Sequence, residues 1–266
     1  MRPNKVREIW RAGGHVLNGW CGIPNGFSAE IMAHMGWDSL VVDMQHGVID
    51  YQVMVSMLQG ISTTDVTPMV RVPWNDPPAI MKALDAGAYG VICPMINSRA
   101  QCEAFVGACR YAPRGYRSSG PIRATLYGGP DYHEKADDTI VALAMIETRE
   151  ALDNLDAILS TPGLDGIYVG PSDLSISLGH APGLDKSDEF MISALTRIID
   201  GCKRHGVQPG LHTGSTAYAK RMLGMGFKFV TVMGDARLLT MAGQQIVREM
   251  REGADTAKPR ASGSPY

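Results

Sequence analysis

The sequence predicts a single (β/α)8 barrel, and three observations favour this fold class. The chain has 266 residues, a length that this architecture commonly reaches in one domain. Eight short apolar runs end in polar or glycine-rich turns, and stretches with helical periodicity separate them. Short, continuously apolar runs are typical of strands that are buried on both faces of a parallel sheet. A doubly wound open sheet has the same alternation, so it stays open as the alternative fold.

The predicted strands and helices alternate along the chain. The strands comprise Val16–Trp20, Leu40–Asp43, Met69–Val72, Val91–Pro94, Val141–Ile146, Gly166–Val169, Gln208–His212 and Phe229–Met233. The amphipathic helices comprise Tyr51–Gly60, Pro78–Ala86, Arg99–Arg110, Ala151–Ser160, Glu189–His205 and Ala217–Met225.

Two segments depart from this order. Ala112 to Asp138 is rich in Gly, Pro, Arg and Tyr and is too long for an ordinary connection, so we expect a functional loop there. The chain forms one domain over residues 1–266, and the sequence after Arg251 turns into Gly, Ala, Ser and Pro. We therefore expect a flexible tail near residues 254–266, unless a neighbouring subunit holds it.

Composition limits the classes of function. Hydrophobic residues make up 45% and charged residues 20%, which is typical of a soluble globular protein with a large core. The net charge of -2 and the scattered basic residues disfavour a nucleic-acid partner. No run reaches the roughly 18 apolar residues that span a bilayer, and no apolar run follows the basic N-terminus, so we expect neither a membrane segment nor a signal peptide. The five cysteines lack CxxC spacing, which indicates a reducing cytoplasm.

Acidic side chains follow two neighbouring strands. In a barrel, the functional groups lie where strands end and loops begin. Glu147 closes the fifth predicted strand, and Asp173 follows the sixth after the turn Gly170-Pro171. Two such carboxylates can share one divalent cation, and oxygen ligands favour Mg²⁺ or Mn²⁺ over zinc. The alternative is that each carboxylate only caps the helix after it.

Other strand ends carry a cation and two histidines. Arg71 ends the third strand and could face an anionic substrate. A structural salt bridge to Glu147 or Asp43 is an equally open alternative. His46 follows Asp43 by three residues, close enough for the carboxylate to orient the imidazole as a base. His212 ends the seventh strand and should also point to the barrel mouth.

Three further features limit the chemistry. The turn formed by Gly170, Pro171, Ser172 and Asp173 offers backbone amides at a helix start, where a carboxylate can bind. No Walker A loop or GxGxxG fingerprint is present, so a nucleotide cofactor is not indicated. None of the apolar runs ends in lysine, which disfavours a Schiff-base mechanism.

Several motifs resemble those of one enzyme family. They are LVVDMQHG (Leu40–Gly47), PMVRVPWND (Pro68–Asp76), MKALDAGAYGVICPMINS (Met81–Ser98), YAPRGYRSSGP (Tyr111–Pro121) and the long run MIETREAL…GIYVGPSDLSISLG (Met145–Gly179). The pattern resembles the class II, metal-dependent pyruvate aldolases of the 2-dehydro-3-deoxyglucarate and 4-hydroxy-2-oxoheptanedioate aldolase type. The resemblance covers about residues 5 to 250.

The resemblance implies roles for the strand-end residues. Glu147 and Asp173 match the metal ligands, with Mg²⁺, Mn²⁺ or Co²⁺ as the ion. His46 matches the catalytic base, Asp43 its partner, and Arg71 the residue that polarises the keto oxygen. The backbone of Pro171–Asp173, with Gly170 and Ser172, matches the seat of the substrate carboxylate.

The resemblance also implies a reaction and an assembly. The reaction is a reversible retro-aldol cleavage of 4-hydroxy-2-oxo acids to pyruvate or hydroxypyruvate and an aldehyde, through a metal-stabilised enolate. The fold is a barrel of the phosphoenolpyruvate/pyruvate-binding type whose C-terminal helix is exchanged between subunits, typically in a hexamer. A CoA-ester lyase of the same superfamily and a non-catalytic barrel remain the alternative functions.

Three positions depart from the family pattern. Met145 stands where the family usually has Gln, and Gln45 stands where it usually has Glu. His212 lies where many relatives carry an apolar residue that shapes the acceptor pocket. The resemblance therefore leaves the donor and the acceptor open, and a polar acceptor or a hydroxylated donor becomes conceivable.

Overall fold

The eight predicted strands close into one barrel in the computed structural model, which describes residues 1–252. The strands are β1 (Val16–Cys21), β2 (Ser39–Asp43), β3 (Thr67–Arg71), β4 (Gly90–Cys93), β5 (Val141–Ile146), β6 (Gly166–Val169), β7 (Gln208–Thr213) and β8 (Phe229–Val232). All neighbours are parallel, and β8 pairs with β1 through Val16 and Phe229. The barrel prediction is therefore confirmed, and the open-sheet alternative is wrong. The predicted flexible tail, residues 254–266, lies outside the described residues.

Each strand buries two faces, which explains its continuous apolar sequence. Side chains such as Val42, Val70 and Ile167 point outward and pack beneath the helices. Alternate side chains such as Leu143 and Phe229 point inward and fill the barrel.

The first helix closes the amino end of the barrel. In α1 (Lys5–Arg11), Val6 is fully buried among the inward side chains. The Trp10 ring meets Phe229 edge-on at 6.3 Å, and its Nε1 donates to the carbonyl of Lys228 at 2.9 Å. This end is therefore closed, and the opposite end, where the strands finish, is left for a site.

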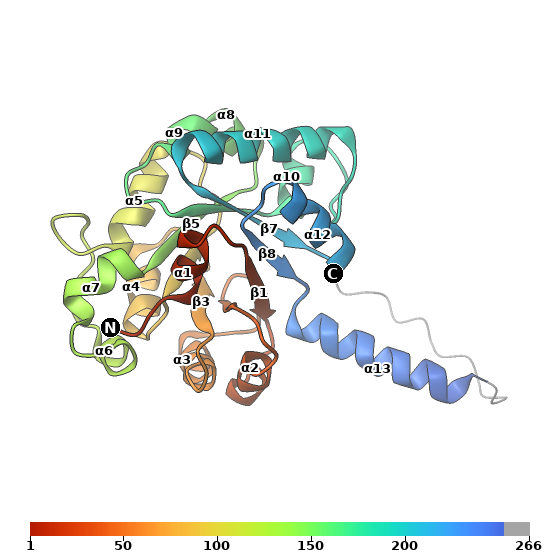
Figure 1. Ribbon diagram of the computed structural model, residues 1–266, viewed down its shortest axis with the longest axis horizontal. Helices are drawn as coiled ribbons and strands as arrows, with labels where there is room; N and C mark the ends of the chain where they lie inside the picture. The colour runs from red at the N-terminus through yellow and green to blue at the C-terminus, as the bar shows by residue number, and fades with distance from the viewer. Residues whose placement is uncertain (253–266) are drawn as a thin grey trace.

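The remaining helices surround the barrel, except for the last one, which projects from it (Figure 1). They are α2 (Gly26–Ala33), α3 (Tyr51–Ile61), α4 (Pro77–Asp85), α5 (Arg99–Cys109), α6 (Ile122–Gly128), α7 (Tyr132–Thr139), α8 (Arg149–Asp153), α9 (Leu155–Leu159), α10 (Pro171–Ser177), α11 (Glu189–His205), α12 (Thr216–Met225) and α13 (Asp235–Arg251). Side chains of Asp50, Asp76 and Ser98 accept backbone N–H groups at the starts of α3, α4 and α5.

Two predicted segments differ from the structure. The predicted helix Ala151–Ser160 is two short helices, α8 and α9, which meet at Asn154. The Asn154 side chain donates to the carbonyl of Asn97 at 2.8 Å, and this bond ties the break to the loop before α5.

The segment from Ala112 to Asp138 is not one loop, because it contains most of α6 and α7. Arg117 holds this segment in place, and its side chain is buried, with 4% exposed. The Arg117 guanidinium donates to Asp85 at 2.7 Å and to the Tyr132 hydroxyl at 3.1 Å. These bonds join the start of the segment to α4 and to its own α7, which the composition of the segment did not indicate.

The last helix leaves the barrel. Asp235 holds its start, because its carboxylate accepts the N–H groups of Gly22 at 2.9 Å and Ile23 at 3.0 Å. Asp235 is the only buried residue of α13, and the rest of the helix extends away from the barrel (Figure 1). No helix in residues 1–252 combines the length and the apolar character that a membrane crossing requires.

Candidate active site

Asp43 and Arg71 form the centre of the site at the carboxyl end of the barrel. They are register partners at the ends of β2 and β3. Arg71 donates to the Asp43 carboxylate through Nε at 2.8 Å and through Nη2 at 2.6 Å. The salt bridge that the sequence left open as an alternative is therefore formed. The guanidinium also lies over the ring of Trp20, 4.8 Å from its centroid, and so stays in the barrel mouth.

The Asp43 carboxylate is fully engaged by donors. Besides the two bonds from Arg71, it accepts from Trp20 Nε1 at 3.1 Å and from the backbone N–H groups of Gln45 at 3.1 Å and His46 at 3.3 Å. Burial alone would raise the pKa of Asp43, but the hydrogen bonds and the charge of Arg71 outweigh it and hold the pKa below its usual value. Asp43 is therefore a carboxylate that fixes its neighbours.

His46 is held through its backbone. The sequence predicts that Asp43 orients the imidazole, but the bond runs to the His46 backbone N–H, and within residues 1–252 none joins the two side chains. A carboxylate offers about four lone-pair positions, and five donors already use them. The imidazole is exposed at the mouth. Its role as a base therefore stays a prediction.

Glu147 lies buried at the end of β5, with 2% of its surface exposed. Its Oε1 accepts the backbone N–H of Met95 at 2.8 Å. Met95 adopts the left-handed backbone conformation, with φ 56°, which is uncommon for a residue with a side chain. The pKa of Glu147 is raised to about 7, because burial and the nearby Asp173 raise it by more than the Met95 N–H and Arg71 lower it.

Neither acidic residue caps a helix. Thr148 caps α8, because its side chain accepts the N–H of Ala151. The residue before α10 is Gly170, which has no side-chain cap, and Asp173 lies exposed in the first turn. The capping alternative is therefore wrong for both.

The two carboxylates fit a divalent cation. Residues 1–252 hold no cluster of three or more His, Cys, Asp or Glu side chains arranged for a metal. Glu147 and Asp173 would therefore be the only such protein ligands, and substrate and water would fill the other positions. Hard cations such as Mg²⁺ prefer this oxygen set. A cation would also offset the cost of burying the charged Glu147.

Gly170 makes room for the Glu147 carboxylate. A Cβ atom on Gly170 would lie 2.5 Å from Glu147 Oε2 and 3.2 Å from Met145 Cε. Gly170 therefore belongs to the site because of its size. Met145 is buried inside the barrel beside this glycine, so it lies next to the acidic group as the sequence predicts.

His212 points into the same mouth and is half-buried. The Trp20 ring meets its imidazole edge-on at 5.1 Å, and Nδ1 lies 2.9 Å from the Tyr168 hydroxyl. The pKa of His212 is lowered to about 4, mainly by burial and also by the positive charge of Arg71. The imidazole is therefore neutral near pH 7.

Several polar residues inside the barrel were not predicted from the sequence as site residues. Asn18, Ser39 and Thr231 are fully buried, and Trp20 and Tyr168 touch the site. One signal could have found them, because these residues occupy inward positions of strands whose alternate residues are apolar.

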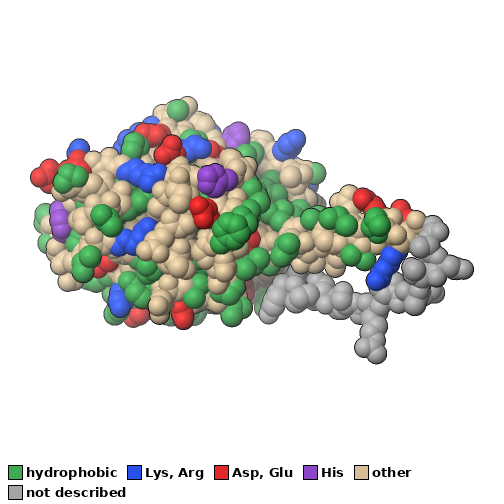
Figure 2. Space-filling model, turned by 90° about the horizontal axis from the view of Figure 1, so that it is seen from below, with side chains coloured by type: hydrophobic (Ala, Val, Ile, Leu, Met, Phe, Trp, Pro, Cys, Tyr) green, Lys and Arg blue, Asp and Glu red, His purple; other side chains and the backbone are tan. Residues whose placement is uncertain are grey.

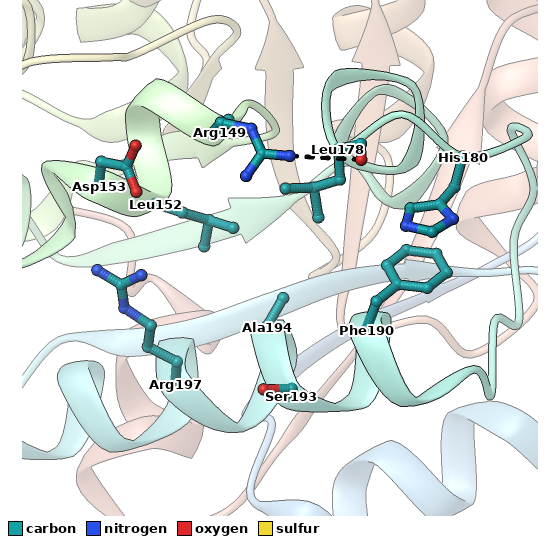
Figure 3. Close-up of a pocket in the computed structure, with 9 residues that line it drawn as sticks. All are labelled: Arg149, Leu152, Asp153, Leu178, His180, Phe190, Ser193, Ala194 and Arg197. Carbon is teal, nitrogen blue, oxygen red and sulfur yellow. Dashed lines mark hydrogen bonds between the residues drawn. The ribbon is translucent and has the colours of Figure 1, made fainter.

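A separate surface pocket of about 300 Å³ lies outside the barrel (Figure 3). Residues of α8 and α11 line it together with Leu178 and His180. Arg149 donates to the carbonyl of Leu178 at 3.4 Å, and His180 stacks on Phe190. None of the predicted site residues lines this pocket, so the site at the barrel mouth is distinct from it.

The fold and the site define a class of protein. A closed parallel barrel carries its chemistry at the carboxyl ends of its strands, where this chain holds a buried glutamate, an Asp–Arg pair and a neutral histidine. The chain is therefore a (β/α)8-barrel enzyme with an acidic site.

The chain belongs to the HpcH/HpaI aldolase/citrate lyase family, whose model matches residues 20–241. It is 44% identical over 248 residues to the hydroxypyruvate/pyruvate aldolase of Rhizorhabdus wittichii, and the aligned region covers 93% of this chain and 99% of that relative. It is 36% identical over 263 residues to the 4-hydroxy-2-oxo-heptane-1,7-dioate aldolase of Salmonella dublin, which covers 98% of each chain.

A solved structure of the same family has the same fold. The HpcH/HpaI aldolase/citrate lyase family protein of Burkholderia cenocepacia J2315 matches with a TM-score of 0.86 and 30% identity, over 93% of this chain and 99% of that one. With these relatives, the chain is a carbon–carbon lyase of the aldolase type, as the sequence motifs predict.

Proposed function

We propose that this aldolase reversibly cleaves 4-hydroxy-2-oxo acids to an aldehyde and pyruvate or hydroxypyruvate, with a divalent cation held by Glu147 and Asp173. One observation carries the proposal. Glu147 is buried, uses only Oε1 to bind Met95, and has a pKa raised to about 7 by burial and by Asp173. The ionised form of a carboxyl group in this position costs free energy unless a cation binds to it. Both relatives are named for 2-oxo acid aldolases, which supports the substrate class.

Mg²⁺, Mn²⁺ and Co²⁺ suit this oxygen set. The cation supplies a Lewis acid that polarises the keto group of the substrate. The substrate carboxylate binds at the backbone of Gly170–Asp173, where the N–H groups of Ser172 and Asp173 have no partner within the helix because α10 begins at Pro171. His212 and Met145 complete the wall of the substrate site.

Two side chains, His46 and Arg71, then act in the cleavage. The His46 imidazole takes the proton of the C4 hydroxyl group, and the aldehyde forms as the C3–C4 bond breaks. The electron pair of that bond moves to the donor fragment and makes an enolate, which becomes the 2-oxo acid when His46 returns its proton to C3. The Arg71 guanidinium, which Asp43 and Trp20 hold in place, faces the enolate oxygen. Synthesis follows the reverse path.

Metal removal tests this proposal. The chelated protein should lose cleavage of a 4-hydroxy-2-oxo acid, and added Mg²⁺, Mn²⁺ or Co²⁺ should restore it. Mn²⁺ should bind the wild type and bind weakly to Glu147→Gln, as measured by calorimetry without substrate. Full activity after exhaustive removal of metal would refute the metal assignment.

For the assembly, we propose a homo-oligomer in which α13 packs on a second copy of the chain. The resemblance of the sequence motifs to the aldolase family favours a hexamer. The exposed apolar side chains of α13 include Leu239, Ile246 and Met250. These three lie on one side of the helix, because they are spaced by seven and four residues. Figure 2 shows hydrophobic side chains along this projecting helix. We also keep the cytoplasm as the proposed compartment, because the five cysteines are free and buried.

A further inference from the structure

The loop of residues 94–98, which joins β4 to α5, contacts the proposed metal ligand Glu147. The backbone N–H of Met95 in this loop donates to Glu147 Oε1 at 2.8 Å. Met95 has a left-handed backbone conformation, with φ 56°, which is unfavourable for a residue with a side chain. Other contacts must therefore hold the loop in the position from which its N–H reaches the carboxylate.

Asn97 ties this loop to the end of β5. The Thr148 hydroxyl donates to Asn97 Oδ1 at 2.5 Å, and Asn154 Nδ2 donates to the Asn97 carbonyl at 2.8 Å. The Asn97 N–H donates to Gln101 Oε1 at 2.7 Å. Because Thr148 directly follows Glu147 in the chain, the loop is bonded both to the glutamate and to its neighbour. These bonds hold the loop against the strand that carries the acidic group.

The two carboxylate oxygens of Glu147 therefore have different surroundings. Oε1 is engaged by the N–H of Met95. Oε2 lies on the side of Gly170, where a Cβ atom would be 2.5 Å from it. Gly170 directly precedes α10, whose first turn carries Asp173. A cation shared with Asp173 would therefore meet Oε2, and turning both oxygens toward it would require the bond to Met95 to break.

We propose that this loop, positioned by Asn97, makes Glu147 bind the cation through one oxygen and so favours Mg²⁺ over Ca²⁺. The inference rests on the proposed metal site and adds its selectivity. Mg²⁺ requires a near-ideal octahedron with short bonds, whereas Ca²⁺ accepts more oxygens in a flexible geometry and often takes both oxygens of one carboxylate. A carboxylate with one oxygen held back suits Mg²⁺ better. Met95 and Asn97 are thus positioning residues.

Calorimetry of the metal-free protein with Mg²⁺ and with Ca²⁺, without substrate, tests this selectivity. The quantity measured is the ratio of the Kd for Ca²⁺ to the Kd for Mg²⁺. Met95→Val should lower this ratio at least about ten-fold, because a β-branched residue resists the left-handed conformation and the N–H then leaves Glu147. Asn97→Ala should lower the ratio in the same direction, because the loop loses its bond to Thr148.

Each variant has a matched control. Met95→Gly keeps the N–H, and glycine adopts a positive φ without steric cost. Asn75→Ala is the control for Asn97→Ala, because Asn75 Nδ2 donates to the carbonyl of Gln101 at 3.0 Å and this bond does not involve the end of β5. Both controls should keep the wild-type ratio. A general loss of stability weakens the binding of both ions, so the ratio distinguishes positioning from a purely structural role.

The outcomes separate this inference from the proposed function. If wild type binds no divalent cation, the metal assignment fails and the inference fails with it. If wild type binds Mg²⁺ but neither Met95→Val nor Asn97→Ala changes the ratio, only the inference is overturned. A crystal structure of wild type with Ca²⁺ should show Glu147 Oε2 alone on the ion. Both oxygens of Glu147 on the ion would overturn the inference as well.

Discussion

Glu147 and Asp43 illustrate two ways in which this fold buries a carboxyl group. Asp43 is buried too, but Arg71 and Trp20 surround it with donors and its pKa is lowered. Glu147 has one backbone donor, and its pKa is raised to about 7 by burial and by Asp173. The donors around Asp43 therefore stabilise its charged form, whereas Glu147 lacks such compensation, which is why we propose that a cation binds there.

This difference predicts a pH-dependent effect of Glu147→Gln on the metal-free protein. The pKa of Glu147 is about 7 in the folded state, against an ordinary value of 4.5 for a glutamate exposed to water. The folded state therefore binds more protons than the unfolded state between these values, and Glu147 makes the fold less stable as pH rises through this window. Glu147→Gln removes that penalty. Its free energy of unfolding should exceed that of wild type by on the order of 1–3 kcal/mol at pH 8, with little difference below pH 4.5.

Thermal unfolding in chelator across this pH range measures the effect. Glu150→Gln, at an exposed position in α8, is the control and should show no such trend. Excess Mn²⁺ should reverse the order, because only wild type gains stability from binding the ion. A difference between Glu147→Gln and wild type that does not change with pH would contradict the explanation.

A second residue-scale prediction concerns Gly170→Ala. The added Cβ would lie 2.5 Å from Glu147 Oε2, which is closer than unbonded atoms can lie, so the carboxylate must move. Mn²⁺ affinity measured by calorimetry should fall at least about ten-fold, since a shift of the ligand by a few tenths of an ångström already disturbs the coordination. Gly224→Ala, which meets no atom within 4 Å, should keep the wild-type affinity. Equal affinities in all three proteins would exclude the proposed role of Gly170.

At the scale of elements, glycines allow α2 and α3 to pack closely. A Cβ on Gly60 of α3 would lie 2.4 Å from the carbonyl oxygen of Gly26 in α2, and a Cβ on Gly26 would lie 3.0 Å from the carbonyl oxygen of Ser56. Both neighbours are backbone atoms, so they cannot rotate out of the way. The two helices therefore depend on these glycines for their separation.

Gly60→Ala should destabilise the fold. Alanine favours a helix over glycine by up to about 1 kcal/mol, but overpacking against backbone costs about 1–3 kcal/mol, so the net change should be a loss of stability. Urea unfolding measures it. Gly224→Ala in α12 has the same helical gain without the clash and should be as stable as wild type or more so. Equal stabilities of Gly60→Ala and Gly224→Ala would argue that α2 and α3 can move apart freely.

At the scale of the whole molecule, α13 is the one helix of residues 1–252 that buries only its first residue. A row of exposed apolar side chains is unfavourable in water, so we expect another protein surface to cover it. The double substitution Leu239→Lys with Ile246→Lys should therefore lower the mass of the oligomer. Light scattering after gel filtration measures this mass.

Gln244→Lys adds a positive charge to the helix away from the row that Leu239 and Ile246 share, and it should leave the mass unchanged. A wild-type monomer, or an unchanged mass for the double variant, would refute the packing of α13 on a second copy.

The order of strands and helices could be predicted from the sequence because each is specified locally. Val141–Ile146, Gly166–Val169 and Glu189–His205 have the same bounds in prediction and structure. The two acidic residues could be found for the same reason, since a polar residue that ends an apolar strand must emerge at the mouth of a barrel. The short helices α6 and α7 could not, because the bonds of Arg117 to Asp85 and Tyr132 in this segment depend on tertiary packing.

The sequence by itself therefore determined the barrel and the strand ends that carry Asp43, Arg71, Glu147 and His212. Only the tertiary structure decided which of these groups touch. Asp43 bonds the backbone of His46 and not its ring, Met95 supplies the N–H for Glu147, and Tyr168 holds His212. The physical reason is that strand identity depends on neighbouring residues, whereas these contacts depend on the register between strands that are far apart in the chain.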